Sequence, residues 1–102
     1  MTEVYAEKDG SRYTIYAKGH ATGSEACCAA ISGILYALLG YLVNAEKAGE
    51  AEILERRMEP GNVAIEYRGG EESGGAFYMA AIGLAQLQES YPGTVLVTAR
   101  EI

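Results

Sequence analysis

The sequence predicts an α+β fold, a mostly antiparallel sheet with two helices packed on one of its faces. Several short segments alternate apolar and polar side chains, as strands with one buried face do, and two longer segments repeat apolar residues at helical spacing. Their order is ββαββαβ. Because strands come in pairs instead of alternating with helices, this order favours an α+β layer. One domain, 1–102, is expected, since 102 residues is near the commonest domain size.

The chain begins with a predicted β-hairpin. Residues 2–9 (TEVYAEKD) and 12–21 (RYTIYAKGHA) each show two-residue alternation, and Asp9-Gly10-Ser11 between them is typical of a tight turn. The faces expected to point inward carry Val4, Ala6, Tyr13, Ile15 and Ala17.

A long apolar helix is predicted next. Ser24 is the expected N-cap, and Glu25 adds a negative charge in the first turn. The helix runs to about Lys47, and Ala48-Gly49 ends it. Residues 27–43 of this helix are almost all apolar. This stretch is near the minimum length for a membrane-spanning helix, and it lacks a basic flank. We therefore expect a helix packed on nearly all sides, and no membrane partner.

A second pair of strands is predicted over 51–59 and 62–69, across the turn Glu59-Pro60-Gly61-Asn62. The glycine-rich stretch 69–75 (GGEESGG) has no lysine and no phosphate-loop pattern. We interpret this stretch as a mobile connection.

The second helix is expected over roughly 76–90, where apolar residues recur at helical spacing. Tyr91-Pro92-Gly93 stops this helix, and residues 94–101 (TVLVTARE) form the last strand. The apolar residues at helical spacing are Phe77, Ala81, Leu84 and Leu87.

Charge and cysteine content limit the partners and the compartment. The formal net charge of −6 repels phosphate, which argues against nucleic-acid binding and favours a basic protein partner. The first ten residues are polar and acidic, unlike a secretory signal. Adjacent cysteines rarely pair with each other, so we expect a cytoplasmic protein with both thiols free.

The only histidine and both cysteines fall within residues 19–32 (GHATGSEACCAAIS). Cys27 and Cys28 lie at the predicted helix start, where the helix dipole and unpaired N–H groups stabilise a thiolate. His20 precedes this start by a short tether that contains Gly23, so its imidazole can fold back towards a thiol. A nucleophile, a base and backbone donors for an oxyanion are the minimum parts of a cysteine hydrolase.

Each of these residues also has a purely structural interpretation. Cys27 aligns with apolar residues one and two turns along, which favours packing in the core. Cys28 aligns with Ser32, which makes it the better candidate nucleophile. Ser32 could position substrate or bond to its own helix, and Glu25 could orient His20 or only complement the dipole. Adjacent cysteines suit a zinc site poorly, so no metal or other cofactor is expected.

The segment resembles the motif of a known family, the ribosomal-processing cysteine proteases called Prp. Family members carry Gly-His-Ala at a strand end, and then an acidic residue three positions before a Cys-Ala-Ala-Val-Ser-like helix start. The matching residues here are Gly19-His20-Ala21, Glu25 and Cys28-Ala29-Ala30-Ile31-Ser32. The order of strands and helices is also similar over nearly the whole chain.

The resemblance implies that His20 is the general base and Cys28 the nucleophile, with Ser32 and Glu25 at other shared positions. It further implies a homodimer that removes a short N-terminal extension from a ribosomal large-subunit protein. Relatives in prophages are assigned capsid or scaffold proteins as substrates. In the family, the loop before the cysteine covers the substrate. Here that loop, around Thr22-Gly23-Ser24, is shorter and keeps one glycine, which favours a prophage-type or specialised relative.

We therefore expect a cysteine endopeptidase that acts near the N-terminus of a protein substrate. The alternative is a catalytically inert Prp-like module that binds a protein partner or only dimerises. A redox-active thiol protein is a third hypothesis, disfavoured because the chain has no Cys-X-X-Cys pair.

Overall fold

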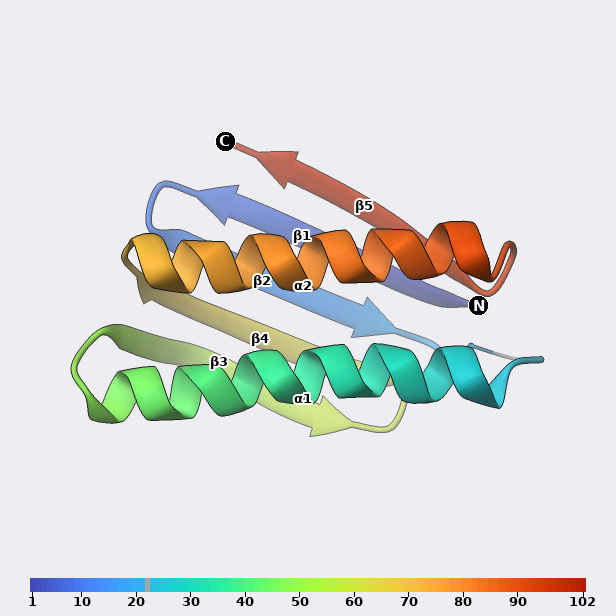
Figure 1. The fold of residues 1–102 in the computed structure, drawn as a ribbon, viewed down its shortest axis with the longest axis horizontal. Coiled ribbons are helices and arrows are strands. Elements are labelled where there is room, and N and C mark those ends of the chain that lie inside the picture. Colours follow the sequence, from blue (N-terminus) through green and yellow to red (C-terminus); the bar gives the residue numbers. More distant parts are fainter. Residues whose placement is uncertain (22) are drawn as a thin grey trace.

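The computed structural model describes residues 1–21 and 23–102, and the elements follow the predicted order (Figure 1). The two helices are α1 (Glu25–Lys47) and α2 (Glu71–Ser90). The strands are β1 (Thr2–Asp9), β2 (Arg12–Lys18), β3 (Ala51–Glu59), β4 (Asn62–Gly69) and β5 (Val95–Glu101).

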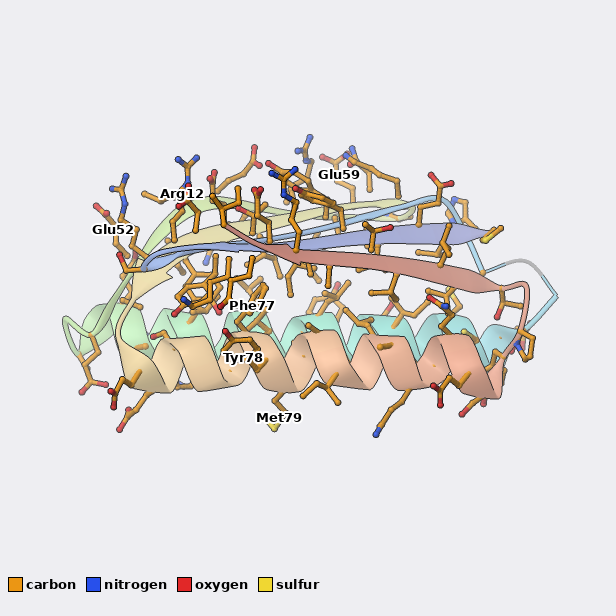
Figure 2. All side chains as sticks on the ribbon, turned by 90° about the horizontal axis from the view of Figure 1, so that it is seen from above. Arg12, Glu52, Glu59, Phe77, Tyr78 and Met79 are labelled. Atoms are coloured by element: carbon orange, nitrogen blue, oxygen red, sulfur yellow. The ribbon has the colours of Figure 1, made fainter. Side chains whose placement is uncertain are left out.

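The five strands form one sheet in the order β3-β4-β2-β1-β5. Only the β1–β5 pair is parallel; the other three pairs are antiparallel. Both helices cover the same face of this sheet, and the opposite face carries charged side chains such as Arg12 and Glu52 (Figures 1 and 2). The predicted α+β fold with two helices on one face is confirmed.

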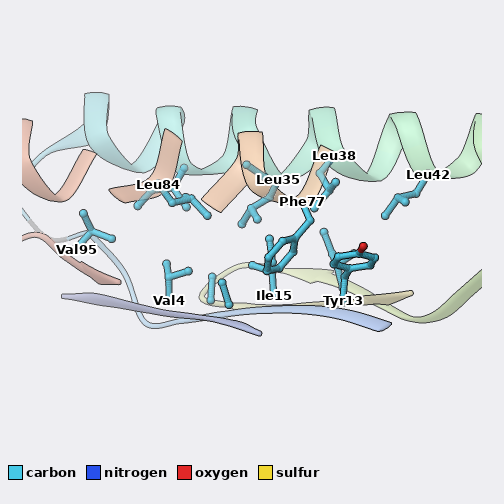
Figure 3. Close-up of a cluster of buried hydrophobic side chains, with 14 of the residues drawn as sticks. Val4, Tyr13, Ile15, Leu35, Leu38, Leu42, Phe77, Leu84 and Val95 are labelled. Carbon is cyan, nitrogen blue, oxygen red and sulfur yellow. The ribbon is translucent and has the colours of Figure 1, made fainter. Parts of the chain in front are cut away.

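The core lies between the sheet and the helix layer (Figure 3). All five hairpin residues that the alternation placed inward are buried, and from the sheet side they meet apolar side chains of both helices. Each large apolar side chain buried in this way contributes on the order of 1.5–3 kcal/mol of transfer free energy. The helix side of the core includes Leu35, Leu38, Leu42, Phe77 and Leu84.

The prediction that α1 is packed on nearly all sides is wrong. A single stripe of this helix is buried against the sheet, and Tyr36 on the outer side is 60% exposed. The physical reason is the two-layer architecture, in which nothing within the described chain covers the outer face of the helices. By length and composition α1 could cross a membrane, but core helices pass the same test. The buried stripe comprises Cys27, Ile31, Leu35, Leu38, Leu42 and Ala45.

The interpretation of GGEESGG as a mobile connection is also wrong, because α2 begins at Glu71 within it. Gly74 is buried, and a Cβ atom there would lie 2.5 Å from the Tyr13 hydroxyl oxygen. The Tyr67 hydroxyl donates a 2.9 Å hydrogen bond to the Ser73 carbonyl, and burial raises the pKa of Tyr67. The absence of a side chain at Gly74 therefore allows close packing of helix on sheet, and the acidic first turn complements the helix dipole.

Two neighbouring glycines in α2 provide a test of this packing. Gly74→Ala should destabilise the protein by about 1–3 kcal/mol, because the Tyr13 ring is stacked on Tyr67, also contacts Phe77 and cannot easily move away. Gly75→Ala is the matched control, since its Cβ would meet no atom within 4 Å. It should stabilise the helix by up to about 1 kcal/mol. Urea denaturation would measure both, and equal effects would contradict the packing argument.

Candidate active site

Three segments meet at the end of the molecule where α1 begins: the end of β2, the first turns of α1 and the β3–β4 turn (Figure 1). Between them lies a cavity of about 260 Å³. His20 and Cys28 both line this cavity, and Ser32 lines it one helical turn beyond Cys28. The structure thus brings three of the predicted site residues to one opening.

The backbone around His20 is held on both sides. Gly19 has a φ of +89°, and a Cβ atom there would lie 2.5 Å from the Met1 carbonyl oxygen, so glycine is required at this position. Ala21 on the other side is 6% exposed and belongs to the core. His20 itself is exposed. The exposed His20 side chain is therefore held between two residues, Gly19 and Ala21, whose positions are fixed by packing.

Ser24 caps α1, as predicted. Its Oγ accepts a 3.0 Å hydrogen bond from the Cys27 N–H, and its carbonyl oxygen accepts one of 3.2 Å from the Cys28 N–H. Side-chain caps of this kind contribute typically about 1 kcal/mol. The cap fixes where the helix starts and hence which cysteine faces the cavity.

The two adjacent thiols lie in different environments. Cys27 is 0% exposed, and its Sγ accepts a hydrogen bond of 3.6 Å from the Thr94 hydroxyl. Cys28 is exposed and lines the cavity. Successive helical residues point about 100° apart, so one thiol packs in the core while the next faces solvent. The predicted core position of Cys27 agrees with this placement, and the nucleophilic role of Cys28 stays a prediction.

Two other predicted site residues do not line the cavity. Gly23 adopts a φ of +86° in the turn before α1, and Glu25 is exposed in the first helical turn. Their substrate-binding or orienting roles stay predictions. Thr22, in the predicted covering loop, lies outside the described residues.

The hydrogen bonds at the helix start limit which N–H groups can meet an oxyanion. The N–H groups of Cys27 and Cys28 are both engaged by Ser24. Glu25 and Ala26 belong to the first turn, whose N–H groups have no partner within their own helix. No acceptor for them occurs among residues 1–21 and 23–102. A donor pair at the helix start would therefore come from these two residues.

One wall of the cavity was not predicted from the sequence. Met58, Pro60, Gly61 and Asn62 of the β3–β4 hairpin line it, and so does Tyr36 from α1. The turn itself was predicted, but its position beside His20 follows from the pairing of β2 with β4, which no local pattern reveals. Glu59 also borders the cavity, although its side chain lies on the open face of the sheet (Figure 2).

Metal-ligand side chains do not gather at this site. Within the described ranges 1–21 and 23–102, no group of three or more His, Cys, Asp and Glu residues could hold a metal ion.

The structure thus defines an α+β protein with a histidine and an exposed cysteine on one cavity at the end of its sheet. No protein-family model matches the chain, and no curated protein matches it in sequence. Solved structures do share its fold over nearly the full length.

The ribosomal processing protease Prp from S. aureus, with a covalently linked product peptide, superposes with a TM-score of 0.75 at 14% sequence identity. The match covers 98% of this chain and 100% of that chain. The same protease in complex with a substrate peptide has a TM-score of 0.68. SMU.848 from Streptococcus mutans has a TM-score of 0.72 at 17% identity, over 100% of this chain and 96% of that chain. The chain therefore has the Prp fold.

The unequal burial of the two thiols predicts selective labelling. Iodoacetamide should modify Cys28 in the native protein and reach Cys27 only after unfolding, because Cys27 is 0% exposed. Intact mass and peptide mapping would show one adduct in native wild type and none in native Cys28→Ala. Two adducts at equal rates in the native protein would contradict the core position of Cys27.

Proposed function

We propose that this protein is a cysteine endopeptidase that uses Cys28 as nucleophile and His20 as general base. The observation that carries the proposal is that the only histidine of the chain and its one exposed thiol line the same cavity. The likeness to Prp structures that contain product and substrate peptides adds support, since an extended peptide is what such a site would bind.

The reaction would proceed through an acyl-enzyme. His20 takes the proton from the Cys28 thiol, and the thiolate sulfur forms a bond to the carbonyl carbon of the scissile peptide. When the tetrahedral intermediate collapses, the C–N bond breaks and the imidazolium protonates the leaving amine. A water molecule, deprotonated by His20, then attacks the thioester, and the acid product leaves with the thiol restored.

The oxyanion of both tetrahedral intermediates requires donors. In this proposal they are the first-turn N–H groups of Glu25 and Ala26, helped by the positive end of the α1 dipole. Ser24 supports this arrangement indirectly, because it occupies the N–H groups of Cys27 and Cys28 and fixes the helix start.

The substrate we propose is the N-terminal segment of a basic protein in the cytoplasm. The net charge of −6 favours encounter with such a segment. A short N-terminal extension of a ribosomal large-subunit protein fits this chemistry. A phage structural protein is the second candidate, suggested by the short loop between His20 and Cys28.

A homodimer is part of the proposal, with the outer face of the helix layer as the contact surface. An apolar groove of about 470 Å³ lies between α1 and α2, and Glu72 is the one charged residue among those that line it. Met79, which lines this groove, is 75% exposed, and Ile82 on the same helix is 57% exposed. A chain of net charge −6 repels its own copies, so an almost uncharged face is where two copies can meet at least electrostatic cost.

The catalytic pair can be tested before the substrate is known. Alkylation of Cys28 near neutral pH should be faster in wild type than in His20→Ala, because His20 favours the thiolate. Cleavage of synthetic basic N-terminal peptides, followed by mass spectrometry, should be lost in Cys28→Ala and reduced at least roughly 100-fold in His20→Ala.

Cys27→Ala is the matched control, since it removes the neighbouring thiol without touching the cavity wall. Slow alkylation of Cys28 that ignores His20, together with no cleavage, would support the inert binding module instead. Reversible oxidation without cleavage would support the redox hypothesis.

The dimer proposal has its own measurement. Met79→Glu places like charges in the groove of both copies, so light scattering should report a monomer for this variant and a dimer for wild type. Glu3→Gln on β1, an exposed strand position remote from the helix layer, is the control and should remain dimeric. A wild-type monomer at micromolar concentration would contradict the proposal.

A further inference from the structure

The imidazole of His20 lies directly against the backbone of Gly61 in the β3–β4 turn. A Cβ atom built on Gly61 would lie 2.6 Å from His20 Nε2, 2.8 Å from Cε1 and 3.3 Å from Cδ2. Separations below about 3.0 Å do not occur for real Cβ atoms. The ring therefore occupies the space that any side chain at position 61 would need.

Glycine is required at this position for a second reason, its backbone conformation. Gly61 has a φ of +69° and follows Pro60, the arrangement of a type II turn with proline and glycine at its centre. The β1–β2 turn has a comparable glycine, Gly10, with a φ of +61°. A Cβ atom on Gly10 would meet nothing within 4 Å, and this turn lies at the opposite end of the sheet (Figure 1).

The pairing of β2 with β4 holds both His20 and Gly61 in place. The β2–β4 ladder ends at Lys18 opposite Asn62, and the Lys18 ammonium group donates to the Asn62 side chain. One residue further, the Gly19 N–H donates a 2.9 Å hydrogen bond to the Gly61 carbonyl oxygen. The Gly61 backbone that contacts the imidazole is thus hydrogen-bonded to Gly19, the residue that precedes His20.

We propose that Gly61 is a positioning residue for His20, its missing side chain allowing the imidazole to rest on the β3–β4 turn and stay at the cavity. The proposal rests on the proposed peptidase function for its catalytic meaning. Gly61 lines the cavity but supplies no acid, base or nucleophile to the reaction in this scheme. It acts only through His20, by limiting the ring to one place beside the opening that Cys28 also lines.

The test compares Gly61→Ala with Gly10→Ala. Both place alanine at a similar positive φ, so both should lower the urea midpoint, and Gly61→Ala should lower it at least as much because its Cβ also meets the imidazole. Only Gly61→Ala should displace the imidazole. Because His20 is the only histidine, its ring protons give a single set of NMR signals that report this displacement directly. The chemical shifts should change in Gly61→Ala and stay at wild-type values in Gly10→Ala.

Kinetics provide the second measurement. Gly61→Ala should lower kcat for peptide cleavage by roughly 100-fold with little change in KM, because a displacement of about 1 Å suffices for such a loss. Gly10→Ala should retain wild-type kcat. If alanine at 61 prevents folding, Gly61→Asn and Gly10→Asn replace the pair, since asparagine tolerates positive φ better.

Unchanged His20 signals in folded Gly61→Ala or Gly61→Asn would overturn the proposal. If wild type cleaves no peptide, the peptidase function fails, yet the NMR comparison still decides whether Gly61 positions His20. The two failures are therefore distinguishable.

Discussion

The pairing of β2 with β4 is the constraint on which both the fold and the site depend. These strands are separated in sequence by the whole of α1 and β3, and they join the two hairpins into one sheet. Their register also continues beyond the strands, where the Gly19 N–H meets the Gly61 carbonyl oxygen. A slip of one residue would turn the buried faces outward and separate the imidazole from the turn beneath it. The β2–β4 pairing thus positions both the sheet side of the core and the cavity wall formed by the β3–β4 turn.

The one-sided helix layer explains why this small protein exposes so much apolar surface. Both helices must bury a stripe against the same sheet face, and the charged opposite face of the sheet is open to solvent. Surface ion pairs there, such as Arg12 with Glu66, contribute little stability at this exposure. Stability therefore depends on the single interface between layers, where close approach is obtained with small residues such as Gly74. The outer face of the helix layer lies outside this interface, and exposed apolar side chains such as Met79 lie on it.

The helix start combines two separate tasks within four residues. Ser24 ends the loop and determines the rotation at which α1 leaves it, through hydrogen bonds to the N–H groups of Cys27 and Cys28. That rotation directs Cys27 into the core beside Thr94 and Cys28 into the cavity. Because the capping bonds engage the N–H groups of Cys27 and Cys28, the first-turn N–H groups of α1 without a helical partner are those of Glu25 and Ala26. The same local geometry thus places the candidate nucleophile at the cavity and determines which helix N–H groups the cap engages.

The sequence alone determined the strands, their hairpin turns, the Ser24 cap and the segment 19–32 as the candidate site, because alternation, capping and turn chemistry act between near neighbours. It mistook Gly69–Gly75 for a connection, since glycine favours loops locally, whereas in the structure Gly74 lies in α2 and packs closely against Tyr13 of a distant strand. It also expected a fully packed α1, because apolar composition does not reveal how many layers surround a helix. Only the tertiary structure decided that Gly61 lies beneath His20, since that contact depends on the pairing of strands far apart in the chain.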